Sequence, residues 1–119
     1  MSGRADATIV NISSSAAYAN RNAYAVSKLA VRGLTVAFAR EFAGDGIRVN
    51  AIAPGLVLTD TIRTELPRAE LERALGEQLV QREGRERDII GTLLYLASPK
   101  ASFLTGETLR VTGGFGLSV

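Results

Sequence analysis

The stretch from Ser13 to Lys28, SSSAAYANRNAYAVSK, places hydroxyls, a phenol and an amine within one connection. Tyr24 and Lys28 are four residues apart, so on a helix that opens at Tyr24 both side chains lie on one face, about 6 Å apart at Cβ. An ammonium held near a phenol stabilises the phenolate, which would let Tyr24 exchange a proton near neutral pH. The pattern Tyr-x-x-x-Lys also occurs on ordinary surface helices, so the elements around it must decide its meaning.

The size and composition of the chain predict one compact domain. It has 119 residues, of which 46% are hydrophobic and 22% charged, enough for a buried core. No apolar run approaches the roughly 20 residues that a membrane span needs. The first ten residues, MSGRADATIV, lack the apolar region of a secretory signal. We therefore expect a cytoplasmic protein.

Several classes of chemistry are excluded by residue types that the chain lacks. It contains neither Cys nor His, so thiol catalysis, disulfides and histidine general bases are absent, and no metal-ligand spacing occurs. Its net charge of +2 comes from scattered basic residues, too few for a nucleic-acid-binding surface.

Hydrophobic periodicity predicts alternating strands and helices. The strands are expected at 7–12, 47–53 and 105–114, and the helices at 24–42, about 67–80 and about 87–97. We expect the first strand to be buried on both faces and Asn20 or Asn22 to cap the first helix. The Val, Leu and Phe stripe of that helix is expected to belong to the core.

Strand, helix, strand, helix, strand is typical of right-handed crossover units, so we predict an α/β fold with a parallel sheet in three layers. Ligands of such sheets collect outside the carboxyl ends of the strands. The Ser13–Lys28 connection and the loop at 54–61 both leave from those ends, so the sequence predicts that they line one crevice.

Four segments, taken in order, resemble the second half of the short-chain dehydrogenase/reductase family. They are IVNISS, YAVSK, RVNAIAPGLVLTD and YLASPKASFLTGETLRVTGG, and together they cover about residues 7–116. The resemblance implies a partial Rossmann fold, a small-molecule carbonyl or alcohol substrate, NAD or NADP as cofactor, and carbonyl–alcohol interconversion.

The resemblance also implies roles for particular catalytic residues. Ser14 matches the Ser that hydrogen-bonds the substrate oxygen, with Ser13 and Ser15 as adjacent alternatives. Tyr24 matches the general acid/base. Lys28 matches the lysine that favours the phenolate and contacts the nicotinamide ribose, so Tyr24 and Lys28 both count as cofactor-binding residues.

The loop after the second strand matches the part of the family that holds the nicotinamide. Pro54 and Gly55 match the turn that passes beside the ring, Val57 the backbone that holds the carboxamide, and Thr59 a cofactor contact. From the residues alone, Pro54-Gly55 is equally a plain turn and Thr59 equally the cap of a following helix. Residues 56–84 are expected to form an insert over the substrate.

The sequence departs from the family in two ways. No Gly-rich G-x-x-x-G-x-G motif follows any strand, so the part that seats the pyrophosphate is missing and nothing selects NAD or NADP. The interval from Ser14 to Tyr24 is also shorter than the family's usual one, which leaves the choice among the three serines open.

Two functions therefore stand side by side. One is an NAD(P)-dependent oxidoreductase; the other is a truncated, inactive relative that serves as an oligomeric or binding module. Without the missing half, the first strand has an open edge and the long helix an uncovered face, so we expect a homo-oligomer. No metal is expected.

Overall fold

The computed structural model describes residues 7–117. The three strands are β1 (Thr8–Ile12), β2 (Arg48–Pro54) and β3 (Thr108–Val111). The α-helices are α1 (Ala16–Ala19), α2 (Ala23–Glu41), α3 (Asp60–Glu65), α4 (Arg68–Gly76) and α5 (Glu86–Ala97), with short 3-10 turns η1 (Ala43–Asp45) and η2 (Pro99–Ala101). The expectations drawn from the first ten residues rest partly on 1–6, which lie outside the described range.

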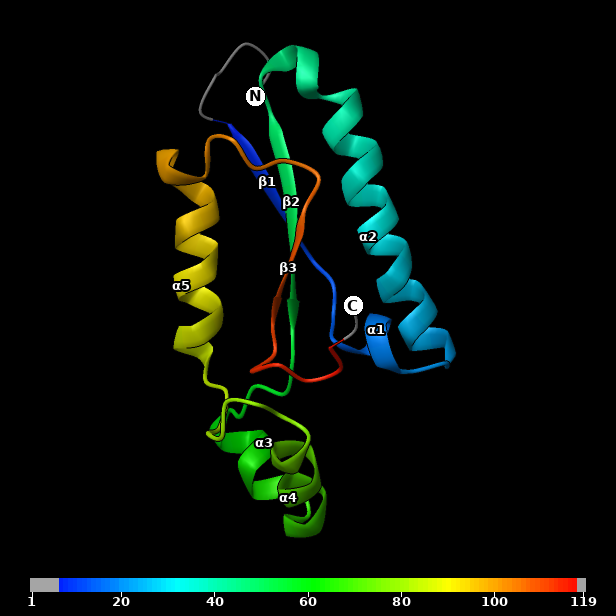
Figure 1. Cartoon of the computed structure of the whole chain (residues 1–119), viewed down its shortest axis with the longest axis vertical. Helices are drawn as coiled ribbons and strands as arrows, with labels where there is room; N and C mark the ends of the chain where they lie inside the picture. The colour runs from blue at the N-terminus through cyan, green and yellow to red at the C-terminus, as the bar shows by residue number, and fades with distance from the viewer. Residues whose placement is uncertain (1–6, 118–119) are drawn as a thin grey trace.

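The strands form one parallel sheet in the order β1-β2-β3 (Figure 1). Ile9 pairs with Val49, and Ile52 pairs with Leu109. Helices α2 and α5 lie on opposite sides of the sheet, while α3 and α4 lie beyond the carboxyl ends of the strands. The α/β fold in three layers is confirmed.

Two hydrophobic clusters hold the layers together. Val49 packs with Ala39 of α2, whereas Ile52 packs with Leu96 of α5. Side chains three residues apart on a strand point to opposite faces, so each face of β2 carries one helix. All four of these side chains are almost completely buried.

The hand of the crossovers differs from the sequence expectation. Both connections step in the same direction across the sheet, because the order is β1-β2-β3, yet their helices lie on opposite faces. Two such crossovers have opposite hands, so the expectation of right-handed units is wrong for one of them. A right-handed pair would have placed both helices on one face and made only two layers.

Strand β1 is half-buried, not buried on both faces as its apolar sequence suggested. It pairs with β2 on one side only, and its last residue, Ile12, is 48% exposed. The central strand β2 has neighbours on both sides, and its residues 49–53 are all buried. Position in the sheet, rather than apolar content, sets the burial of each strand.

The expected core stripe of α2 belongs to the core only in part. Phe38 and Phe42 pack against the cluster around Val49, but most of the Val and Leu positions of the stripe are exposed, which corrects the sequence interpretation. The residues of α2 that are buried are small or polar: Ala25, Thr35 and Ala39. Of the predicted stripe, Val26, Leu29 and Leu34 are 48 to 61% exposed. The helix therefore presents an apolar face that nothing in residues 7–117 covers.

Short elements near the loops account for the remaining differences. Helix α1 forms inside the Ser13–Lys28 connection, for which no helix was expected before Tyr24, and α3 begins within the expected loop at 54–61. Helix α4 and strand β3 are shorter than predicted. Among residues 7–117, no helix combines the length and the apolar character that a membrane crossing requires.

Candidate active site

Two backbone hydrogen bonds tie the loop after β1 to the end of β2. The N–H of Ser13 donates to the Ile52 carbonyl at 2.7 Å, and the N–H of Ser15 donates to the Pro54 carbonyl at 2.8 Å. These bonds continue the parallel ladder past the end of β1. They bring the serine stretch beside the loop that starts at Pro54, as expected for neighbouring parallel strands.

The three serines have different surroundings. Ser13 is 2% exposed, and its Oγ donates to the Lys28 carbonyl at 2.8 Å. The Ser14 Oγ accepts the Ala16 N–H at 3.1 Å, which leaves its own hydrogen available to another acceptor. Ser15 borders a small pocket. Burial therefore removes Ser13 from contact with a substrate, whereas Ser14 and Ser15 are only partly buried.

Helix α2 places Tyr24 and Lys28 together at the carboxyl edge of the sheet. The Asn22 side chain accepts the Ala25 N–H at 2.9 Å, which confirms Asn22 as the cap and starts the helix at Ala23. The Lys28 Nζ lies 5.8 Å from the centroid of the Tyr24 ring. Tyr24 is 55% exposed, so its phenol is accessible from outside.

Lys28 also contacts the end of β1. Its Nζ donates to the Ile12 carbonyl at 3.3 Å, a polar group that β1 presents at its last residue. The ammonium thus contacts this carbonyl and also lies near the phenol ring of Tyr24. Within residues 7–117 Ser14 makes no hydrogen bond with either side chain, so the structure pairs Tyr24 with Lys28 and leaves Ser14 on the adjoining loop.

The loop after β2 packs tightly on β3. The Gly55 N–H donates to the Val111 carbonyl at 2.9 Å. A Cβ built at Gly55 would come 2.9 Å from the Thr112 Cα, so only glycine fits without movement. The close approach fixes the path of the backbone at the point where the resemblance places the nicotinamide.

Further along the same loop, Val57 and Thr59 differ in which hydrogen-bond donor remains unused. Val57 forms an isolated bridge with Gly84, in which the Leu58 N–H donates to the Gly84 carbonyl. Within residues 7–117 the Val57 N–H donates to no group. The Thr59 Oγ1 accepts the Ile62 N–H at 3.2 Å and caps α3, so the capping interpretation is confirmed and its hydroxyl hydrogen remains available.

An open apolar pocket of about 500 Å³ borders this loop, a size typical of small-molecule sites. Its walls come from the loop, from α3 and from α5, and Glu86 is its one ionisable residue. The lining residues are Pro54, Gly55, Leu56, Val57, Ile62, Glu86, Ile89 and Ile90. Three of the four loop residues predicted to bind the cofactor therefore share one surface, whereas Tyr24 and Lys28 lie outside it.

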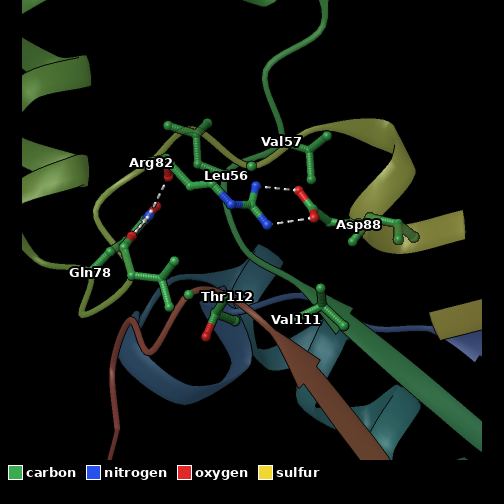
Figure 2. A pocket seen from close by; sticks show the side chains of 11 residues that line it. Leu56, Val57, Gln78, Arg82, Asp88, Val111 and Thr112 are labelled. Atoms are coloured by element: carbon green, nitrogen blue, oxygen red, sulfur yellow. Dashed lines mark hydrogen bonds and ion pairs between the residues drawn. The ribbon is translucent and has the colours of Figure 1, made fainter. Parts of the chain in front are cut away.

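A smaller pocket of about 120 Å³ lies beneath the insert at 56–84 (Figure 2). On its rim Arg82 forms two hydrogen bonds with Asp88, at 2.7 and 2.9 Å. The Asp88 carboxylate also accepts the Arg85 N–H at 2.8 Å. The bond from Arg82, followed by the bond from Arg85, holds the pKa of Asp88 well below its usual range. This pair joins the end of the insert to the first turn of α5.

Two further ion pairs link α3 to the segment before α5. Arg63 pairs with Glu83, and Arg85 lies 3.8 Å from Asp60. Close to the same end of the insert, the N–H groups of Leu79 and Val80 donate to the same carbonyl of Gly113. Together with the bond from the Gly55 N–H to the Val111 carbonyl just before its start, these contacts attach the insert to β3 and to the segment that follows β3.

The sequence interpretation missed a feature beside this site. The guanidinium carbons of Arg32 and Arg110 lie 4.1 and 3.9 Å from the centroid of the Tyr18 ring. At such distances each cation stacks over a ring face, and one face has room for only one guanidinium. Tyr18 therefore lies between α2 and β3 and fixes α1, the helix that follows the serines. The two arginines are 14 and 92 residues away from Tyr18 in the sequence, so no local pattern signals this contact.

Comparisons with known proteins find matches over nearly the whole chain. The model of the family described as enoyl-(acyl carrier protein) reductase matches residues 1–116. A solved short-chain dehydrogenase/reductase from Brucella melitensis is 34% identical, with a TM-score of 0.84 over 95% of this chain. The chain belongs to the short-chain dehydrogenase/reductase family.

The relatives include oxidoreductases of different kinds. An uncharacterized oxidoreductase from Mycobacterium tuberculosis is 43% identical over 115 residues, which are 96% of this chain and 46% of that protein. A 7α-hydroxysteroid dehydrogenase solved with NADH and 7-oxo glycochenodeoxycholic acid is 36% identical, with a TM-score of 0.83 over 92% of this chain and 45% of that one. The structure from Brucella melitensis is matched over 46% of its length. The chain spans about half the length of these relatives.

Proposed function

We propose that the chain contributes the proton-transfer half of a cytoplasmic, NAD(P)-dependent oxidoreductase that interconverts carbonyl compounds and alcohols. The observation that carries the proposal is the position of Tyr24 and Lys28. Their side chains lie next to each other at the carboxyl edge of the sheet. At the same edge, two backbone hydrogen bonds tie the serine stretch to the end of β2, where the loop that starts at Pro54 begins. Membership of the oxidoreductase family supports it. In this proposal residues 1–119 form one domain, and the insert at 56–84 covers the substrate.

Each catalytic residue has a defined task in the proposed reaction. The Ser14 hydroxyl donates a hydrogen bond to the substrate oxygen, since it accepts the Ala16 N–H and keeps its own hydrogen free to donate. During reduction Tyr24 gives its phenolic proton to that oxygen as the carbonyl becomes an alcohol; during oxidation the phenolate takes the proton back. The Lys28 ammonium stabilises the phenolate in either direction.

The loop after β2 fits a nicotinamide cofactor. Its apolar pocket suits a flat ring, and the unengaged Val57 N–H suits a carboxamide oxygen. Thr59 retains a hydroxyl hydrogen for the cofactor's amide or phosphates, and Lys28 contacts the ribose. When bound, the reduced cofactor supplies the hydride that the carbonyl carbon receives.

A matched pair of tyrosine variants tests the proton transfer. We expect Tyr24→Phe to lower ketone-dependent oxidation of NADH or NADPH by about 10²- to 10⁴-fold, the usual contribution of a general acid, because it removes only the transferable proton. Tyr95→Phe makes the same change on α5, 42% exposed, and should leave the rate unchanged. Equal rates for Tyr24→Phe and the unmodified chain would remove Tyr24 from this role.

A second candidate, an inactive module that acts by association, is favoured by the exposed face of α2. Val26, Leu29, Leu34 and Val36 are each 44% or more exposed on this helix, and β1 has an unpaired edge. Such surfaces associate in water. In either case we propose that the chain forms a homo-oligomer. Light scattering that finds a stable monomer at micromolar concentration would contradict this.

A further inference from the structure

Ser13 is a junction between three elements of the sheet edge. Its backbone follows directly from β1, its N–H donates to the Ile52 carbonyl of β2, and its Oγ donates to the Lys28 carbonyl of α2. The side chain is 2% exposed, so no solvent competes for the hydroxyl. Through these two hydrogen bonds Ser13 links the backbone of Lys28 on α2 to the end of β2.

The contact is reciprocal. Ser13 donates to the backbone carbonyl of Lys28, and the Lys28 Nζ donates to the carbonyl of Ile12, the residue before Ser13. One bond fixes where the lysine backbone lies, and the other fixes where its amine lies. A lysine side chain has four rotatable bonds and loses much conformational freedom when its amine is hydrogen-bonded. Fixing the Lys28 backbone therefore narrows the region that its ammonium can reach.

We infer that Ser13 is the positioning residue of Lys28. It holds the helix turn that carries this lysine against the end of β1, so that the ammonium stays near the Ile12 carbonyl and the Tyr24 ring. Ser13 itself touches neither substrate nor cofactor, because it is buried. The inference rests on the proposed function for its consequence, because a lysine held at that place stabilises the Tyr24 phenolate.

The chain offers an internal reference for testing this. Lys28 and Lys100 are its only lysines, and Lys100 is exposed. Brief acetylation with an N-hydroxysuccinimide ester, followed by mass spectrometry of peptides, gives the ratio of the Lys28 rate to the Lys100 rate in one molecule. General loosening of the fold would also expose Lys28, so the ratio is compared only between chains with intact circular dichroism, in which loss of the Ser13 contact acts on Lys28.

The expected results separate positioning from ordinary stability. In the unmodified chain Lys28 reacts more slowly than Lys100. Ser13→Ala raises the ratio by roughly two- to tenfold, the range that one lost hydrogen bond produces. Ser27→Ala is the matched control, since the Ser27 hydroxyl donates within α2 to the Tyr24 carbonyl and makes no tie to β1; its ratio stays unchanged.

An unchanged ratio in a Ser13→Ala chain whose circular dichroism is intact would overturn the inference. If that variant does not fold, the unmodified chain still decides, because Lys28 reacting as fast as Lys100 overturns it as well. The labelling needs no dinucleotide. Failure of the chain to bind NADH would therefore reject the proposed function without touching this result.

Discussion

Replacing Gly55 with Ala should destabilise the fold at the start of the loop after β2. The added Cβ would lie 2.9 Å from the Thr112 Cα and 3.2 Å from its Cβ, whereas carbon atoms in ordinary contact lie about 3.5–4.0 Å apart. One of the atoms in the way is backbone and cannot rotate aside. The loop must therefore move away from β3, against the bond from the Gly55 N–H to the Val111 carbonyl.

The magnitude follows from this overlap. Forced insertion of one methyl group into a packed site costs about 1–3 kcal/mol, so the urea midpoint should fall by about 1 M. Gly33→Ala is the matched control: a Cβ at Gly33 meets nothing within 4 Å on α2. Alanine is the better helix former, so this variant should gain roughly 0.5–1 kcal/mol.

Urea unfolding followed by circular dichroism measures both variants. We expect a lower midpoint for Gly55→Ala and an equal or higher one for Gly33→Ala. A Gly55→Ala chain as stable as the unmodified chain would show that more than glycine fits between the loop after β2 and β3.

Three further predictions concern the elements that hold the site. The pKa of Asp88 is lowered in the folded chain, chiefly by its bond with Arg82. The ionised carboxylate therefore stabilises the fold fully above the unfolded-state pKa of about 4, and this stabilisation is lost as the pH falls below it. Asp88→Asn should flatten the decline of the unfolding free energy between about pH 5 and pH 2, and equal slopes would contradict this. Asn22→Ala removes the cap of α2 and should cost about 0.5–2 kcal/mol in urea unfolding; no loss would show that the cap is dispensable. Leu96→Ala, at a fully buried position, should cost about 2–5 kcal/mol, whereas Leu94→Ala, 64% exposed on the same helix, should change stability by less than about 0.5 kcal/mol; similar losses for both would contradict the assigned core.

The sequence predicted the main elements because each has a strong local signal. Apolar β-branched runs gave β1 and β2 within one residue of their bounds, and the Asn22 cap gave the start of α2. Helix α1 was missed because four residues carry too little periodicity, and α3 because its six residues are mostly polar.

Burial was predicted less well, because it depends on neighbours that the local pattern does not encode. The run of apolar residues in β1 resembles that in β2, yet β1 has one strand beside it and β2 has two. The apolar stripe of α2 likewise reads as core, although residues 7–117 provide nothing to cover Val26 or Leu34.

In the candidate site, too, some features follow from the local sequence and others depend on the fold. The spacing of Tyr24 and Lys28 predicted their adjacency, and the structure places them on one face of α2. The choice among the serines needed the fold, because only the packing of α2 on β1 shows that Ser13 is buried. The two arginines that stack on Tyr18 come from distant positions and meet only through the topology.

A calorimetric titration of NADH and NADPH into the chain tests the central claim most directly. We expect saturable binding of at least one of them, tighter than about 1 mM. Lys28→Met should weaken this binding, whereas Lys100→Met, which removes the only other lysine, should leave it unchanged. Absence of saturable binding below about 1 mM, or equal affinities for Lys28→Met and the unmodified chain, would contradict it.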